Sequence, residues 1–126
     1  MIIKGFISTD KGPVDIRELK VGDRVLNQMH RAHTVTSVET VEVDGGVTFK
    51  KNSSLLLAKA TSVRTLYGNI YLHGIKKISV HMVQPNMREV RDSAVPVEGK
   101  FTAYKIKAEG GESIFASNYC VNLEDE

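Results

Sequence analysis

The chain has a single cysteine, no tryptophan and few aromatic side chains, and each shortage excludes a class of protein. Cys120 is the only thiol among 126 residues, so the chain can form neither an internal disulfide nor a cysteine-rich zinc site. A reducing compartment such as the cytoplasm fits this composition best. The four Tyr and four Phe offer few platforms on which nucleic-acid bases could stack.

Long apolar runs and a strong charge imbalance are also missing. No apolar run approaches the roughly 20 residues of a membrane-spanning helix. The first residues, MIIKGFIST, are too short an apolar stretch for a signal peptide and carry no cleavage-site pattern. We therefore expect no membrane association. The formal net charge of +2 is too small to indicate nucleic-acid binding by itself.

What is present is typical of a soluble globular protein. Hydrophobic residues make up 41% of the chain and charged residues 25%, which argues against disorder. A chain of this length forms one domain, 1–126, and can bury about two-thirds of the surface that its unfolded form exposes.

The distribution of Val, Ile, Thr and Phe predicts a mostly β fold. Strands are expected at 1–9, 24–28, 32–43, 47–51, 54–63, 70–83, 101–109 and 114–123, the last with a kink at Ser117 and Asn118. Turn residues separate them at 10–13, 44–46, 66–69 and 110–113. The segment 14–20 is either a short helical turn or extended. The segment 84–100 holds two of the three prolines and many charges, so it is interpreted as a loop excursion.

Motifs at the two ends of the chain occur in a characteristic order. Near the start, a turn from Thr9 to Gly12 is followed by Ile-Arg-Glu-Leu at 16–19 and by Leu-Lys-Val-Gly-Asp-Arg-Val at 19–25. Near the end, an apolar strand and a turn lead to Phe-Ala-Ser-Asn at 115–118 and further apolar residues. These stretches resemble the Hint domain, the fold shared by inteins and the autoprocessing part of hedgehog proteins.

The resemblance implies a single domain of long, bent strands whose two chain ends lie close together. On this interpretation Gly12, Gly22 and Asp23 are architectural turn residues. Gly22 supplies the backbone angle of the reversal, and the Asp23 carboxylate caps backbone donors of the turn. Ile16 and Leu19 are expected to fill the core beneath it.

The residues that carry self-cleavage in the Hint family have no counterparts in this chain. The family uses a Cys or Ser nucleophile at its first position, which falls just before Met1 when Gly12 is aligned with the family's turn glycine. The family's Thr-x-x-His, which polarises the scissile amide, maps to Lys51 and Ser54. Its terminal His-Asn pair maps to Asn122 and Leu123, and leucine cannot cyclise. A register slipped by one makes Asn122 the terminal residue but puts Val121 in the place of His.

Neither a catalytic residue nor a bound cofactor is therefore predicted. Cys120 lies in an apolar strand and is interpreted as a core residue, with a nucleophilic role as the alternative. Lys50 and Lys51 beside Ser53 and Ser54 suggest a Ser-Lys nucleophile only weakly, because such neighbours are frequent by chance.

No functional site is predicted at the remaining polar clusters either. His30 and His33 would share a helical face, but two ligands with no third do not make a metal site, so none is predicted. His73 and His81 are interpreted as polar strand or turn residues. A basic patch of Lys76, Lys77, Lys100, Lys105 and Lys107 lacks interleaved aromatic residues, which makes nucleic-acid binding an unfavoured alternative.

The sequence thus predicts an inert Hint-like module that binds protein partners or its own copies in a larger assembly, with no small-molecule substrate. The most specific form of this hypothesis is a phage tail or baseplate component, located in the virion and otherwise in the cytoplasm. It rests on where isolated Hint domains occur. Two alternatives stay open, a self-processing domain with a displaced nucleophile, Cys120 or a serine, and a nucleic-acid-binding β-domain.

Overall fold

The protein, a computed structural model, is built almost entirely of antiparallel strands. The structure describes residues 1–27, 29, 31–65, 68–72, 78–84 and 88–123. The elements of these residues are β1 (Ile2–Lys4), β2 (Phe6–Thr9), β3 (Gly12–Asp15), the 3-10 helix η1 (Ile16–Glu18), β4 (Arg24–Leu26), β5 (Ala32–Phe49), β6 (Asn52–Ala58), β7 (Ser62–Thr65), β8 (Gly68–Tyr71), β9 (Ile78–Gln84), β10 (Arg88–Ala108), β11 (Ser113–Ala116) and β12 (Tyr119–Asn122). The predicted mostly β fold class is confirmed.

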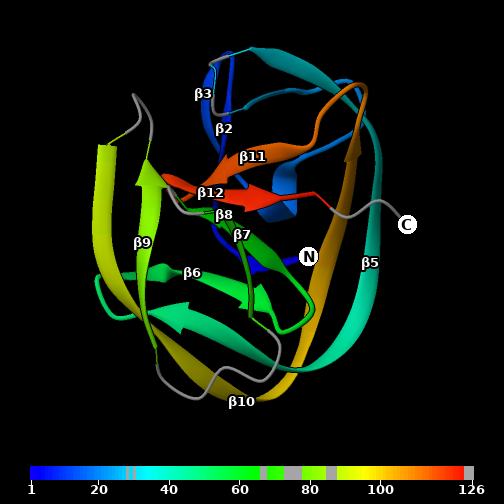
Figure 1. Cartoon of the computed structure of the whole chain (residues 1–126). Helices are drawn as coiled ribbons and strands as arrows, with labels where there is room; N and C mark the ends of the chain where they lie inside the picture. The colour runs from blue at the N-terminus through cyan, green and yellow to red at the C-terminus, as the bar shows by residue number, and fades with distance from the viewer. Residues whose placement is uncertain (28, 30, 66–67, 73–77, 85–87, 124–126) are drawn as a thin grey trace.

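The two longest strands define the shape of the molecule. β5 and β10 run antiparallel from the pair Ala94–Phe49 to the pair Ala108–Val35, and together they curve around the shorter strands (Figure 1). The strand order is β11-β12-β7-β9-β10-β1-β6-β5-β4-β2-β3, and β8 pairs with β7. Further pairings of β11 with β2 and of β10 with β5 close the sheet on itself.

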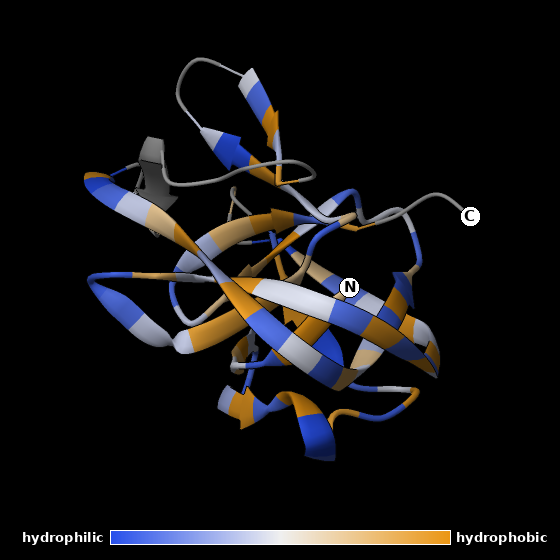
Figure 2. Ribbon diagram, turned by 90° about the horizontal axis from the view of Figure 1, so that it is seen from below, coloured by the Kyte–Doolittle hydropathy of each residue, from blue (hydrophilic) through white to orange (hydrophobic). Residues whose placement is uncertain are grey.

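Alternation of apolar and polar residues explains why these segments are strands. Hydrophobic and hydrophilic residues follow one another along the long strands in Figure 2, so these strands turn one face toward the core, whereas the short strand β11 is buried on both faces. The core joins both halves of the chain, and Phe49 meets Tyr119 edge to face with 5.2 Å between the ring centroids. Among the described residues, no buried side-chain nitrogen or oxygen lacks a hydrogen-bond partner.

The turn that opens the domain has the predicted construction. Gly12 and Gly22 have positive φ angles of 103° and 97°, which favour glycine. The Asp23 carboxylate accepts a hydrogen bond from the Lys20 backbone N–H at 3.0 Å, which confirms the expected cap. Ile16 and Leu19 are buried, as expected.

The segment 14–20 combines the two conformations left open for it, because Val14 and Asp15 end the strand β3 and Ile16–Glu18 form the helical turn η1. Asp15 caps η1 by accepting from the Arg17 backbone N–H, and it also pairs with the Arg17 guanidinium at 2.9 Å. These hydrogen bonds lower the pKa of the Asp15 carboxyl.

The interpretation of 84–100 as a loop is wrong for its described part. Gln84 ends β9, residues 85–87 lie outside the described residues, and β10 begins at Arg88. Asp92 and Ala94 are buried while the residues between and beside them are more exposed, so the charges belong to the outer face of a strand. Pro96 is exposed and lies next to a register shift between Val97 and Lys100, a position where strands tolerate proline.

The expected turn at 44–46 is also wrong, because β5 continues through it. Gly45 has a φ of 73°, and a Cβ on Gly46 would lie 3.0 Å from the Leu57 carbonyl oxygen. On the facing strand, Gly99 has a φ of 134° beside the register shift. The glycines thus let two paired strands bend together, and the chain reverses later, at Lys50 and Lys51.

The final predicted strand is a hairpin rather than one kinked strand. Ser117 and Asn118 have φ angles of 45° and 67°, and Ala116 pairs with Tyr119 across them. Two central residues with positive φ are typical of the tight turns that match strand twist. The hairpin expected around 66–69 is confirmed by the pairing of Thr65 with Gly68, although Leu66 and Tyr67 lie outside the described residues.

Candidate functional site

The first residue of the chain is held by the turn that follows β6. The Thr61 hydroxyl accepts a hydrogen bond from the Met1 nitrogen at 2.8 Å and donates one to the Met1 carbonyl oxygen at 2.8 Å. The Ala58 backbone N–H donates to the same carbonyl at 3.0 Å. Thr61 is fully buried, and its own backbone is tied to Ala58 and Leu72.

This turn divides a segment that the sequence predicts as one strand. The run 54–63 is β6 up to Ala58, a reversal at Lys59 and Ala60, and β7 from Ser62. The reversal brings Thr61 back against Met1. Ala58 and Thr61 are three residues apart, the spacing of the family's amide-polarising motif, but an alanine and a threonine stand in the two positions.

Lys51 and Ser54, to which the sequence alignment assigns that motif, lie elsewhere. Lys51 is in the β5–β6 turn, where its backbone N–H donates to Asp92 at 2.9 Å. The Ser54 hydroxyl donates to the Asn52 side chain at 3.1 Å. Sequence reasoning did not single out Thr61, because it interpreted 54–63 as one strand and did not expect the turn after Ala58.

The last described residues reach the same place. Met1, Asn122 and Leu123 line one small cavity of about 10 Å³, together with Ile2, Val121 and residues 104–106 of β10. The Asn122 amide nitrogen donates to the Ser62 hydroxyl at 2.9 Å and to the Asn69 carbonyl oxygen at 3.1 Å. The two ends therefore lie close together, as predicted, and the space between them is about the smallest that holds one water molecule.

Cys120 does not face this cavity. Neighbouring strand residues point to opposite faces, so Cys120 lies on the other side of the hairpin from Val121 and packs against Phe115. It is fully buried, as the core interpretation predicts, and burial raises the pKa of its thiol. A hydrogen bond with Ser113 opposes this shift but does not overcome it. A neutral, enclosed thiol is a poor nucleophile.

His33 carries the one imidazole among the described side chains, and its hydrogen bonds are to residues other than Met1. His33 lies in β5, its Nδ1 3.0 Å from the Glu109 carbonyl oxygen and its Nε2 2.9 Å from the Asn27 amide nitrogen. Both ring nitrogens of His33 are therefore occupied by contacts within the protein. His30, His73 and the side chain of His81 lie outside the described residues.

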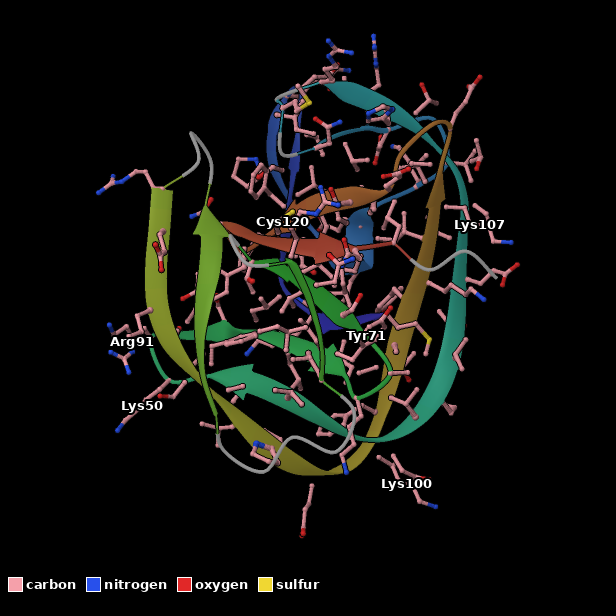
Figure 3. The ribbon with its side chains drawn as sticks, viewed as in Figure 1. Lys50, Tyr71, Arg91, Lys100, Lys107 and Cys120 are labelled. Atoms are coloured by element: carbon pink, nitrogen blue, oxygen red, sulfur yellow. The ribbon has the colours of Figure 1, made fainter. Side chains whose placement is uncertain are left out.

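The predicted basic patch is only partly described. Lys76 and Lys77 lie outside the described residues. Lys105 lines the small cavity at the chain ends, while Lys100 and Lys107 are exposed at separate places along β10 (Figure 3). Among the described residues, no three His, Cys, Asp or Glu side chains gather around a possible metal position, and no helix has the length and hydrophobicity that a membrane crossing requires.

These features define the fold as that of the Hint domain. The gp41-1 intein matches with a TM-score of 0.77 at 17% sequence identity, over 97% of this chain and 95% of that one. The Ssp DnaB mini-intein variant M86 matches with 0.75 at 15%, over 99% and 95%. A DnaB intein from Synechocystis sp. PCC 6803 matches with 0.74 at 15%, over 98% of both chains. No protein-family model and no curated protein matches the sequence.

The contacts of Thr61 give a first testable prediction. Thr61→Val keeps the shape of the side chain but leaves the Met1 nitrogen and carbonyl without their buried partner. We expect the free energy of unfolding in urea to fall by about 1–2 kcal/mol. The matched control is Thr36→Val, an exposed threonine with a long 3.3 Å bond to the Lys107 carbonyl, which should change stability by less than about 0.5 kcal/mol. Equal effects of the two substitutions would show that the Thr61 contacts contribute nothing.

Proposed function

We propose that this chain is a Hint-fold domain that neither splices nor cleaves itself and serves as a protein-interaction module in a larger assembly. The observation that carries the proposal is the set of polar groups around the meeting point of the chain ends. Thr61, Ser62, Asn69 and Asn122 supply hydroxyls and amides there. None of these groups exchanges a proton near neutral pH, whereas peptide-bond cleavage needs a base and an acid for the leaving group.

Three further features support the loss of self-processing. Thr61, in place of an imidazole, accepts from the Met1 nitrogen through a hydroxyl, which is neither a base nor an acid near neutral pH. Leu123 follows Asn122 where the family ends on asparagine, and a leucine side chain has no nucleophile. Cys120 is enclosed beside Phe115, away from both ends. Likeness of fold does not carry activity with it, and the most specific form of the proposal stays a component of a phage tail or baseplate.

The intact mass of the protein tests this directly. The chain is made with a short peptide extension at each end and incubated with thiol at neutral pH, beside the gp41-1 intein bearing the same extensions as a positive control. We expect the mass of this protein to stay unchanged while the control loses its extensions. Loss of either extension at a defined bond would refute the proposal, and Cys120→Ala would then show whether the thiol is the displaced nucleophile.

The interaction part of the proposal needs a second measurement. A module of an assembly should form a complex of defined stoichiometry with a partner or with itself, which sedimentation velocity detects. A protein that stays monomeric at high concentration and is retained by no partner contradicts this part, even if its mass does not change.

A further inference from the structure

A basic hollow lies near the start of β10, whereas the small cavity at the chain ends is lined by residues 104–106, near the end of the same strand. We use this name for the open depression of about 370 Å³ lined by Lys50, Lys51, Arg91, Asp92 and Ser93. Its lining comes from the β5–β6 turn and the start of β10. Lys50 and Arg91 lie next to each other at the edge of the molecule in Figure 3. Both, like Lys51, are exposed.

Backbone hydrogen bonds hold the turn that carries Lys50 and Lys51 against the start of β10. The Lys50 N–H donates to the Ser93 carbonyl oxygen at 3.0 Å. The Lys51 N–H donates to the Asp92 carboxylate at 2.9 Å, and the Ser93 N–H donates to the same oxygen at 2.7 Å. The turn is thus clamped onto the strand, so the positions from which the cationic side chains extend are set before any ligand arrives. Preorganisation of this kind reduces the entropy cost of binding.

The one carboxylate of the basic hollow does not compete with a ligand. Asp92 is 2% exposed, and its second oxygen accepts from the Tyr119 hydroxyl inside the core. The Asp92 carboxylate thus accepts from the Tyr119 hydroxyl in the core and from two backbone N–H groups. Three exposed cationic residues line the opening. Like charges held this close favour a ligand that brings several negative charges.

We propose that the basic hollow binds the carboxylate side chains of an acidic segment of a partner protein. This inference rests on the proposed function and names the chemistry of the partner. An Arg guanidinium holds a carboxylate through two parallel N–H donors, and two lysines beside it can hold neighbouring carboxylates.

Nucleic acid fits the basic hollow less well than an acidic peptide. Among the described side chains, no aromatic one lines it, so none of these stacks a base. The cations form one cluster rather than a track, because Lys100 and Lys107 lie on other parts of β10 in Figure 3. A phosphate backbone needs a succession of contacts along its length.

Fluorescence anisotropy with an acidic peptide tests the site. The probe is a fluorescein-labelled peptide of about eight glutamates, titrated with the full chain at about 50 mM salt, where screening is moderate. The double variant Lys50→Glu/Arg91→Glu should weaken binding about tenfold or more, because it replaces two attractive charges with repulsive ones. The neutral variant Lys50→Gln/Arg91→Gln should show a smaller loss.

The matched control is Lys100→Glu/Lys107→Glu, which changes the net charge of the protein by the same amount at exposed positions of β10. We expect it to bind within about twofold of the unchanged protein at equal salt. Equal weakening by both double variants would show general charge attraction and overturn the proposal, as would the absence of peptide binding. Tighter binding of an oligothymidine of equal charge would assign the hollow to nucleic acid instead. Thermal melting shows that each variant is folded.

The result of the peptide-binding experiment is independent of the proposed loss of self-processing. Peptide affinity does not depend on whether a peptide bond breaks, and the mass measurement does not depend on Lys50 or Arg91. Failure of the peptide to bind, with an unchanged mass, removes the acidic partner and leaves the inert module.

Discussion

Replacing Asp92 with alanine is expected to lower the free energy of unfolding by about 3 kcal/mol, and the melting temperature by roughly 10–15 °C. The carboxylate is buried and accepts from the Tyr119 hydroxyl and from the backbone N–H groups of Lys51 and Ser93. Alanine leaves all three donors without this acceptor, and the Tyr119 hydroxyl among them is buried. Thermal and urea unfolding followed by circular dichroism measure the loss.

Two further variants distinguish the stability lost with the Asp92 hydrogen bonds from the stability lost by removing any carboxylate side chain. Asp92→Asn keeps an oxygen for the two backbone donors and offers its amide to the Tyr119 oxygen, so we expect a loss of only about 1 kcal/mol. Asp10→Ala removes an exposed carboxylate and should stay within about 0.5 kcal/mol of the unchanged protein. If Asp92→Ala were as stable as Asp10→Ala, the clamp beneath the basic hollow would not exist.

The second large effect is the protection of Cys120 from alkylation. The thiol is fully buried against Phe115, and burial raises its pKa, so little thiolate forms at neutral pH and little of it is accessible. Even a local opening that costs about 3 kcal/mol lowers the labelling rate about a hundredfold relative to the unfolded chain. We expect labelling with iodoacetamide, followed by mass, to be slower by at least this factor in buffer than in urea.

An exposed cysteine introduced in the same protein gives the reference rate in the folded state. Ser37→Cys in Cys120→Ala places the thiol at a partly exposed position of β5. If Cys120 reacted as fast as this reference in buffer, the thiol would be available, and self-processing with a displaced nucleophile would gain its first physical support.

The sequence predicted those parts of the fold that are determined by residues close together in the chain. Local patterns sufficed for the turn at Gly22 and Asp23, because glycine and a capping carboxylate act within a few residues. They misled at Gly45 and at 84–100, where glycine, proline and charge are ordinary markers of a turn or loop. There the partner strand decides: the pairing of β5 with β10 keeps both segments extended, and the glycines serve its bend. A long-range pairing leaves little local trace.

In the candidate site, too, only residues that a local motif marks could be predicted. Asn122 and Leu123 were found because they follow the Phe-Ala-Ser-Asn motif at 115–118 by a few residues, although the hairpin there was interpreted as one kinked strand. Thr61 was not, because the reversal at Lys59 and Ala60 carries no glycine, proline or asparagine to mark it. The basic hollow could not be predicted from the sequence either, because only the fold brings Lys50 and Arg91 together.

The place of β1 in the sheet has a consequence for the order in which the molecule is assembled. Ile2 pairs with Leu57 on one side and with Tyr104 on the other, so β1, the first strand of this domain to be synthesised, is an inner strand of the finished sheet. Its second neighbour is synthesised near the end of the chain, and β12 later still. Such distant pairings make folding slow, because long loops must close before their contacts form. The nascent chain therefore waits, with its N-terminal strand exposed to chaperones, until nearly all of the domain has been translated.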